Sequence, residues 1–260
     1  MMVLLNVLSL TSSAQRSIFL AAGQSNAVGK GDSSRSVHPA AGVAVEYRWK
    51  SNTLEPLHDP VGEDDGHFQV AGTGSMWPAF AAAYHQRTRD TVIIVPAARG
   101  GASCHEKARL GDMDTWDTSG NLFTAAVAKI KAAAALSKGV LKGIIWLQGE
   151  RDANAINSGG LQPAEYKTAL SNLILRFRKE LGDALPFYIV KTGNYKGHPV
   201  TGFDTVRKIQ EDLAETMPNV FIVYRDAPLF EAKGRMTDEI HYNQNGLNHI
   251  GATVARAIKK

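Results

Sequence analysis

Short apolar runs alternate along the chain with longer segments in which apolar residues recur at helical spacing. The apolar runs are rich in Val, Ile and Phe, and they lie at 17–21, 43–47, 91–95, 143–147, 187–190 and 220–223. Near-continuous apolar strands are typical of strands that are buried on both faces, as in a parallel sheet. The pattern therefore predicts a set of parallel β-strands in the interior of one sheet.

Helices are expected between these strands, at 75–87, 122–136, 163–181, 204–217 and 244–258. Pro78 and Pro163 fall in the first turns of two of them, where proline is tolerated, and Gly182 follows the third, where glycine commonly ends a helix. The alternation predicts one α/β domain, a three-layer sandwich with a central parallel sheet of about five strands and helices on both faces. Residues 30–74 are expected to form a long loop around a short strand.

The length and composition suit one such domain. The chain has 260 residues, of which 44% are hydrophobic, and this is enough for one well-buried core. The formal net charge is only +4 and the basic residues are scattered, whereas nucleic-acid binding usually needs a basic patch or stripe. No apolar run approaches the roughly 20 residues that a membrane helix requires. We therefore expect neither a nucleic-acid partner nor a membrane partner, and the oligomeric state stays open.

Residues 1–14 are apolar and then small, and they resemble a short secretory signal that lacks the usual positive charge. This favours a secreted or periplasmic protein with residues 15–260 as its domain. A mis-started N-terminus on a cytoplasmic protein is the alternative. Cys104 is the only cysteine, so neither an intrachain disulfide nor a cysteine metal cluster can form. We expect no metal and no cofactor.

Polar, glycine-containing blocks follow three of the predicted strands, and ligands of parallel α/β sheets bind at the carboxyl ends of the strands. Residues 23–26, Gly-Gln-Ser-Asn, follow the first strand, and Ser25 either faces the crevice or caps the next helix. Gly100 and Gly101 follow the third strand, where their N–H groups either point to a ligand or form a simple loop. Residues 148–150, Gln-Gly-Glu, follow the fourth strand, and such groups are costly to bury unpaired.

Asp238 and His241 stand just before the last predicted helix. A histidine that acts as a base needs a carboxylate or carbonyl on one ring nitrogen, so that the other nitrogen can take a proton. An Asp three residues earlier can supply that partner, and the other seven histidines have no comparable neighbour. A hydroxyl, backbone donors, a base and an orienting acid together are what covalent acyl transfer requires.

These four blocks resemble the SGNH hydrolase superfamily, and within it the sialate O-acetylesterases and acetylxylan esterases of carbohydrate esterase family 6. The matching residues lie between about 18 and 250, in the order and spacing of that group. The resemblance implies a flavodoxin-like SGNH hydrolase fold. It also implies a serine esterase that removes short acyl groups, above all acetyl, from an acetylated carbohydrate.

By this resemblance, Ser25 is the nucleophile, His241 is the general base and then the general acid, and Asp238 is the carboxylate that orients the histidine. Glu150 is a supporting residue and the alternative partner for His241. Two other functions stay open, a non-catalytic carbohydrate-binding protein and an esterase of lipids or small molecules.

The same resemblance assigns an oxyanion hole to the backbone N–H of Ser25, an N–H at Gly100 or Gly101, and the side chain of Gln148. Gln148 stands where the superfamily usually has an Asn. Arg151 stands where a small residue is more usual. If its side chain points into the cleft, an acidic sugar such as a uronic or sialic acid is favoured, and if it points outward the charge does not bear on the substrate.

Overall fold

The computed structural model describes residues 15–259, so the expected signal segment at 1–14 lies outside the described residues. One sheet contains seven strands in the order β3-β2-β4-β1-β5-β6-β7. The strands are β1 (Arg16–Gly23), β2 (Ala44–Arg48), β3 (Thr53–Pro56), β4 (Thr91–Ala98), β5 (Val140–Leu147), β6 (Phe187–Val190) and β7 (Val220–Tyr224). All pairs are parallel except β2 and β3. The predicted parallel sheet is confirmed, and it is larger than about five strands because the antiparallel edge strand β3 was not predicted.

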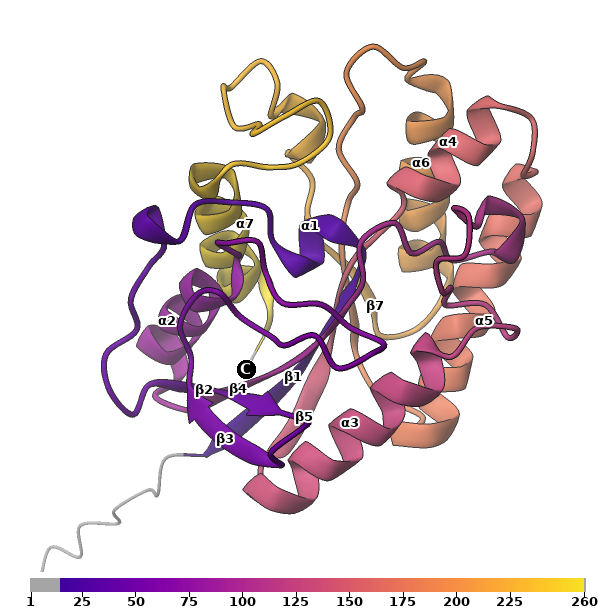
Figure 1. Cartoon of the computed structure of the whole chain (residues 1–260). Helices are drawn as coiled ribbons and strands as arrows, with labels where there is room; N and C mark the ends of the chain where they lie inside the picture. Colours follow the sequence, from indigo (N-terminus) through magenta and orange to yellow (C-terminus); the bar gives the residue numbers. More distant parts are fainter. Residues whose placement is uncertain (1–14, 260) are drawn as a thin grey trace, which may run out of the picture.

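Helices cover both faces of the sheet, as the sequence predicted (Figure 1). Helices α2 and α7 lie on one face, and α3, α5 and α6 lie on the other. Two short helices, α1 and α4, were not predicted, and each begins within one of the polar blocks. The bounds are α1 (Ser25–Val28), α2 (Trp77–Thr88), α3 (Leu122–Ser137), α4 (Glu150–Asn157), α5 (Pro163–Leu181), α6 (Thr201–Thr216) and α7 (Gln244–Ala257).

Strand β1 runs through the middle of the sheet and explains why the apolar runs are uninterrupted. Ile18 and Leu20 pack into the core beneath α3, α5 and α6, whereas Phe19 and Ala21 pack into the core beneath α2 and α7. Successive side chains of a strand point to opposite faces, so a strand between two helical layers needs apolar residues at every position. The nucleophile candidate, Ser25, thus follows the central strand of the sheet.

The carboxyl ends of β4, β1 and β5 lie side by side. Gly23 is level with Ala98 of β4 and with Leu147 of β5. Its backbone has φ +140, and a Cβ at this position would lie 2.0 Å from the carbonyl oxygen of Leu147. Only glycine allows this close approach. The three polar blocks, which are far apart in the sequence, therefore leave the sheet at one edge.

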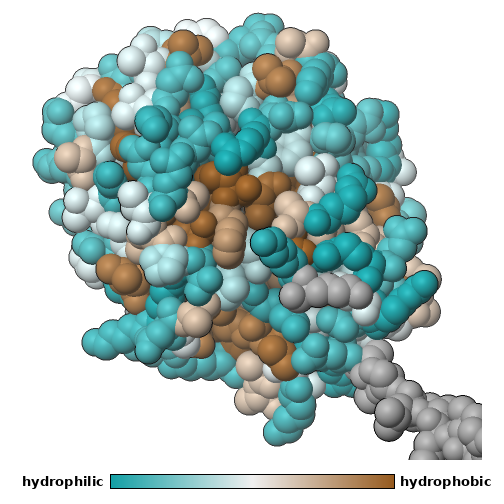
Figure 2. Space-filling view, turned by 180° about the vertical axis from the view of Figure 1, so that it is seen from behind, coloured by the Kyte–Doolittle hydropathy of each residue, from teal (hydrophilic) through white to brown (hydrophobic). Residues whose placement is uncertain are grey.

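The surface of the molecule is mostly hydrophilic. In the view from behind, hydrophobic side chains gather near the middle of the face and hydrophilic ones surround them (Figure 2). Between residues 15 and 259, the structure contains no helix with the length and apolarity that crossing a membrane would take.

Candidate active site

Ser25, His241 and Asp238 form a continuous hydrogen-bonded relay. The Nε2 atom of His241 lies 3.0 Å from Ser25 Oγ, and its Nδ1 atom lies 2.7 Å from Asp238 Oδ2. Ser25 is the first residue of α1 and Gln24 is the N-cap, so the Ser25 hydroxyl does not cap the helix. The structure therefore brings together the three residues that the sequence singled out, with 216 positions between the serine and the histidine.

Asp238 is held in place by the turn that it shares with His241. Its Oδ1 accepts hydrogen bonds from the backbone N–H of Ile240 at 2.9 Å and of His241 at 2.7 Å. Partial burial raises the pKa of Asp238, but the hydrogen bonds from the His241 ring and from these two N–H groups outweigh it and bring the pKa below its ordinary value. At neutral pH this residue is a carboxylate that accepts the Nδ1 proton and leaves Nε2 free to accept the proton of Ser25.

Glu150 contacts the loop of His241 indirectly, through Asn26. It is buried, and its Oε1 accepts a hydrogen bond from Asn26 Nδ2 at 2.8 Å. Asn26 also donates to the carbonyl of Ile240 at 3.2 Å and accepts from the N–H of Tyr242 at 3.1 Å. Among residues 15–259 the carboxylate that hydrogen-bonds the His241 ring is that of Asp238, and Glu150 reaches the histidine loop through Asn26. Burial raises the pKa of Glu150 above its ordinary value.

Two backbone N–H groups are available beside Ser25. In the described part of the chain, the N–H groups of Ser25 and Gly101 have no acceptor, whereas Gly100 donates its N–H to Gln69 Oε1 at 2.8 Å. A Cβ at Gly100 would lie 3.9 Å from the Cβ of Ser25, so this turn packs directly against the nucleophile. Sequence reasoning missed Gln69, which comes from the long loop at 30–74 and has no motif of its own.

Gln148 is oriented differently from the expectation of an oxyanion donor. The side chain is buried, and its amide nitrogen donates to the carbonyl of Ala102 at 3.3 Å and to Asp152 Oδ2. Both amide hydrogens are therefore engaged, and Gln148 is not among the residues that line the cleft. Donation to the oxyanion stays a prediction, and it requires the amide to leave one of these partners.

A cleft of about 930 Å³ opens in front of Ser25 and His241. Three cationic side chains line it, those of Lys30, Lys107 and Arg151, and none of the described residues that line it is an Asp or a Glu. The side chain of Arg151 points into the wall of the cleft, where its Nε donates to the carbonyl of Ala108 at 2.7 Å. The rim also carries Tyr195 and His198, whose rings stack with centroids 3.8 Å apart.

Two other kinds of site, a reactive cysteine and a metal-binding cluster, find little support in the described part of the chain. Cys104 is buried, and burial raises the pKa of its thiol well above the ordinary value, which disfavours the reactive thiolate form. Between residues 15 and 259 there is no group of three His, Cys, Asp or Glu side chains placed to hold a metal ion.

Solved structures of other proteins share this fold. A protein from Arabidopsis thaliana superposes with a TM-score of 0.72 at 24% identity, over 93% of this chain and 97% of that one. NanS superposes with a TM-score of 0.65 at 16% identity, over 94% of this chain and 96% of that one. A carbohydrate acetylesterase from Xanthomonas citri gives 0.55 at 17% identity, over 93% of this chain and 56% of that one.

The chain also matches a known family along its sequence. No curated protein matches it. The model of the family described as "Carbohydrate esterase, sialic acid-specific acetylesterase" matches residues 15–260, the whole of the predicted domain, and this confirms the resemblance found in the four blocks. The chain therefore belongs to this family of carbohydrate esterases.

Proposed function

We propose that the protein hydrolyses acetyl esters of an acidic sugar, with Ser25 as nucleophile, His241 as base and Asp238 as the carboxylate that orients it. The observation that carries this proposal is the unbroken relay, 3.0 Å from Ser25 Oγ to His241 Nε2 and 2.7 Å from His241 Nδ1 to Asp238. Hydrogen-bond reach between nucleophile, base and orienting group is the geometric mark of an activated serine.

In the proposed reaction His241 Nε2 takes the proton of Ser25 as the serine oxygen attacks the acetyl carbonyl. The carbonyl π electrons move to oxygen, and the N–H groups of Ser25 and Gly101 stabilise the oxyanion, with Gln148 as the further predicted donor. Gly100 can join them if Gln69 gives up its N–H. The C–O bond to the sugar then breaks, and the sugar oxygen takes the proton from His241. Water repeats the sequence on the acetyl-serine and releases acetate.

The composition of the cleft supports an acidic sugar. Lys30, Lys107 and Arg151 line it without a lining carboxylate. The Nζ of Lys107 is paired with Glu165 at 2.5 Å, whereas the ammonium group of Lys30 has no hydrogen-bond or ion-pair partner among the described residues. The stacked rings of Tyr195 and His198 offer an apolar, partly exposed face of the kind against which a sugar ring packs. Together with the family's description, these features favour a sialic acid over the neutral sugars of xylan.

Replacing the nucleophile tests the reaction class. We expect Ser25→Ala to lower kcat for p-nitrophenyl acetate on the order of a thousandfold or more. A fluorophosphonate probe should label the wild-type protein and not the variant, because only an activated serine reacts. A wild-type protein that is never labelled, and that hydrolyses the ester no faster than the uncatalysed background, would be a non-catalytic carbohydrate-binding protein.

Lys30 tests the substrate class. We expect Lys30→Gln to raise KM several-fold for O-acetylated sialic acid and to leave p-nitrophenyl acetate hydrolysis unchanged, because only the first substrate carries a carboxylate. Lys50→Gln, which removes an exposed lysine outside the cleft, is the control. Higher kcat/KM on acetylated xylan than on O-acetylated sialic acid would refute the acidic substrate. Rising activity with longer acyl chains would favour lipid esters.

We also propose that residues 15–260 form the mature domain of an exported protein. The support is the apolar and then small character of residues 1–14. Sequencing the N-terminus of protein recovered from the periplasm or medium of an expressing bacterium tests this, and a chain that keeps Met1 in the cytoplasm contradicts it.

A further inference from the structure

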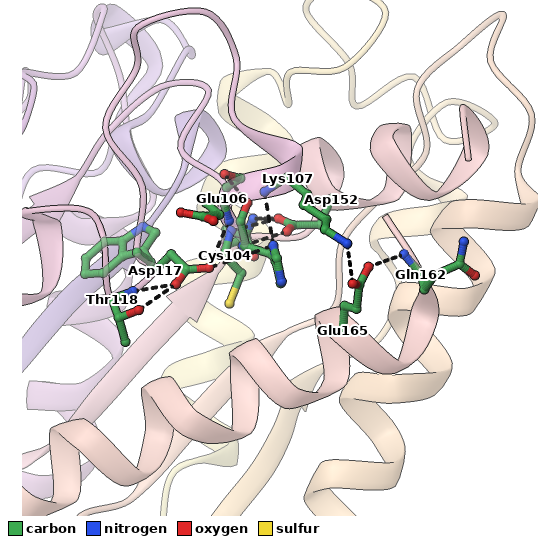
Figure 3. A network of polar contacts seen from close by, with 12 residues as sticks. Cys104, Glu106, Lys107, Asp117, Thr118, Asp152, Gln162 and Glu165 are labelled. Atoms are coloured by element: carbon green, nitrogen blue, oxygen red, sulfur yellow. Dashed lines mark hydrogen bonds and ion pairs between the residues drawn. The ribbon is translucent and has the colours of Figure 1, made fainter. Parts of the chain in front are cut away.

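Asp152 is a buried carboxylate on α4 that binds three donors at once. Its Oδ2 accepts the backbone N–H of Cys104 at 2.9 Å, and its Oδ1 accepts the N–H of His105 at 3.0 Å. Its Oδ2 also accepts a hydrogen bond from the side chain of Gln148. Asp152 lies at the centre of the polar network in Figure 3, close to Cys104.

Two of these donors, the N–H groups of Cys104 and His105, belong to the segment that continues from the Gly100–Gly101 turn. Ala102 accepts a hydrogen bond from Gln148, and the next two anchored residues, Cys104 and His105, donate to Asp152. The turn is thus fixed from its downstream side by α4 and by the end of β5. On its upstream side the N–H of Arg99 bonds the carbonyl of Gly23 at 3.3 Å, next to the nucleophile block.

The network extends along the same segment toward the cleft (Figure 3). Asp117 accepts the N–H of Glu106 at 2.9 Å. Glu165, at the start of α5, binds the Nζ of Lys107 at 2.5 Å and the N–H of Gln162 at 2.9 Å. Three carboxylates from different parts of the chain therefore hold residues 104–107, and only Asp152 among the three is fully buried.

A carboxylate is the side chain that this position requires. All three partners are donors, and an ionised carboxyl group is acceptor-only with room for several hydrogen bonds. An amide would turn an N–H group toward at least one of the three donors. Burial raises the pKa of Asp152 to about 6, and the hydrogen bonds from Cys104, Gln148 and His105 offset part of the desolvation cost of the ionised group.

Helix α4 carries Asp152 two residues after Glu150, and the two carboxyl groups reach opposite sides of the site. Glu150 holds Asn26, which bonds the loop of the base. Asp152 holds the segment that follows the Gly101 N–H. One short helix thereby fixes both the base loop and the glycine turn relative to Ser25.

We propose that Asp152 is a positioning residue for acyl transfer, which holds the Gly100–Gly101 turn so that the Gly101 N–H points at the oxyanion formed on Ser25. Asp152 touches neither substrate nor nucleophile, and it acts through the backbone of Cys104 and His105. This inference rests on the proposed function and goes beyond it, because it assigns to a buried carboxylate a part in stabilising the transition state. A group made complementary to the transition state affects turnover more than substrate binding.

The test is Asp152→Asn, with kcat expressed per active serine titrated by a fluorophosphonate. We expect kcat for p-nitrophenyl acetate to fall on the order of a hundredfold, as for a displacement of catalytic donors by about an ångström, and KM to stay within about twofold. Normalising to titrated serine removes the effect of any unfolded fraction, so a role in stability alone would leave this kcat unchanged. Wild-type kcat in Asp152→Asn overturns the proposal.

Asp117→Asn is the matched control, because Asp117 also anchors a backbone N–H of the same segment, at Glu106, but farther from the glycine turn. We expect it to lower thermal stability and to leave kcat per titrated serine near the wild-type value. Equal losses of kcat in the two variants would indicate general loosening of the segment and would overturn the assignment to Asp152.

Asp152→Ala keeps the inference testable if the Asn variant does not fold, because water can enter the space and accept from the three donors. Its kcat should fall while KM is retained, and an unchanged kcat overturns the proposal. Ser25→Ala measured in parallel separates a failure of the esterase mechanism from a failure of the role proposed for Asp152. If Ser25→Ala is inactive and Asp152→Ala is fully active, the esterase mechanism stands and only the role of Asp152 fails.

Discussion

At the scale of single residues, the orientation of His241 depends on two layers of hydrogen bonds. The inner layer is Asp238, which binds the ring and the backbone of the same turn. The outer layer is the pair Glu150 and Asn26, which holds the neighbouring backbone at Ile240 and Tyr242. The carboxyl groups of Asp238 and Glu150 thus have different roles, and single substitutions can separate these roles.

Asp238→Asn should cost far more turnover than Glu150→Gln. We expect a fall in kcat on the order of a thousandfold for Asp238→Asn, because an amide can donate to Nδ1 and so stabilise the wrong tautomer. Glu150→Gln keeps the oxygen that accepts from Asn26, so its loss should be on the order of tenfold or less. Steady-state kinetics with p-nitrophenyl acetate measures both losses of kcat. A larger loss of kcat in Glu150→Gln would make Glu150, and not Asp238, the carboxylate that orients His241.

Gln148→Ala distinguishes a side chain that donates to the oxyanion from one that only stabilises the fold. If the amide leaves Asp152 and donates to the oxyanion, kcat should fall on the order of a hundredfold at unchanged KM. If it remains on Ala102 and Asp152, the variant should mainly lose thermal stability. Kinetics and thermal unfolding on the same preparation separate these outcomes.

At this scale the sequence reveals a pairing when the two residues are close along the chain. Asp238 and His241 are three positions apart, and the sequence therefore displays their partnership. The contact between Gln69 and Gly100 joins residues 31 positions apart, and that between Asn26 and Glu150 spans 124. Such pairings form only when the chain folds, and no local sequence pattern predicts them.

At the scale of elements, the apolar periodicity located every long helix and every parallel strand. It missed α1, α4 and β3, whose lengths are four, eight and four residues. A helix this short completes too few turns to display a 3.6-residue period, and β3 is half exposed at the sheet edge, so it has no apolar run. The missed helices are the ones that carry Ser25, Glu150 and Asp152.

The close contact of β1 and β5 at Gly23 makes a prediction about these elements. Gly23→Ala places a Cβ against the carbonyl of Leu147 in a backbone conformation that L-residues rarely adopt. We expect the free energy of unfolding to fall by more than about 1 kcal/mol and kcat to fall with it, because the nucleophile turn must shift. Gly182→Ala, whose Cβ meets open space at φ +129, is the control for backbone strain alone.

At the scale of the whole molecule, one buried acid outside the site sets a pH dependence of stability. Glu46 of β2 is fully buried, where it accepts the N–H of Gly62 at 2.7 Å and binds Arg48 at 2.6 Å. Burial raises its pKa from 4.5 to about 7, although the Gly62 N–H and the cations Arg48 and Lys129 oppose the shift. The folded state therefore binds a proton more tightly at this position than the unfolded state does.

The stability of the wild type should consequently fall, relative to Glu46→Gln, as the pH rises from 4.5 to 7. The expected difference is about 3 kcal/mol, fully developed above pH 7. Urea unfolding of both proteins at several pH values measures it, and Glu55→Gln on the exposed part of β3 is the control. Parallel pH profiles for the wild type and Glu46→Gln would show that Glu46 titrates normally.

The hydrogen bond between Ser25 and His241 joins α1, which follows the first strand, to the loop that precedes the last helix. Contacts between such remote segments form late, since the intervening chain must first be ordered. During renaturation from urea, ester hydrolysis should thus return after the far-UV circular dichroism of the helices. Recovered hydrolysis then reports that the docking of α7 beside α2 is complete, a stricter criterion of nativeness than secondary structure.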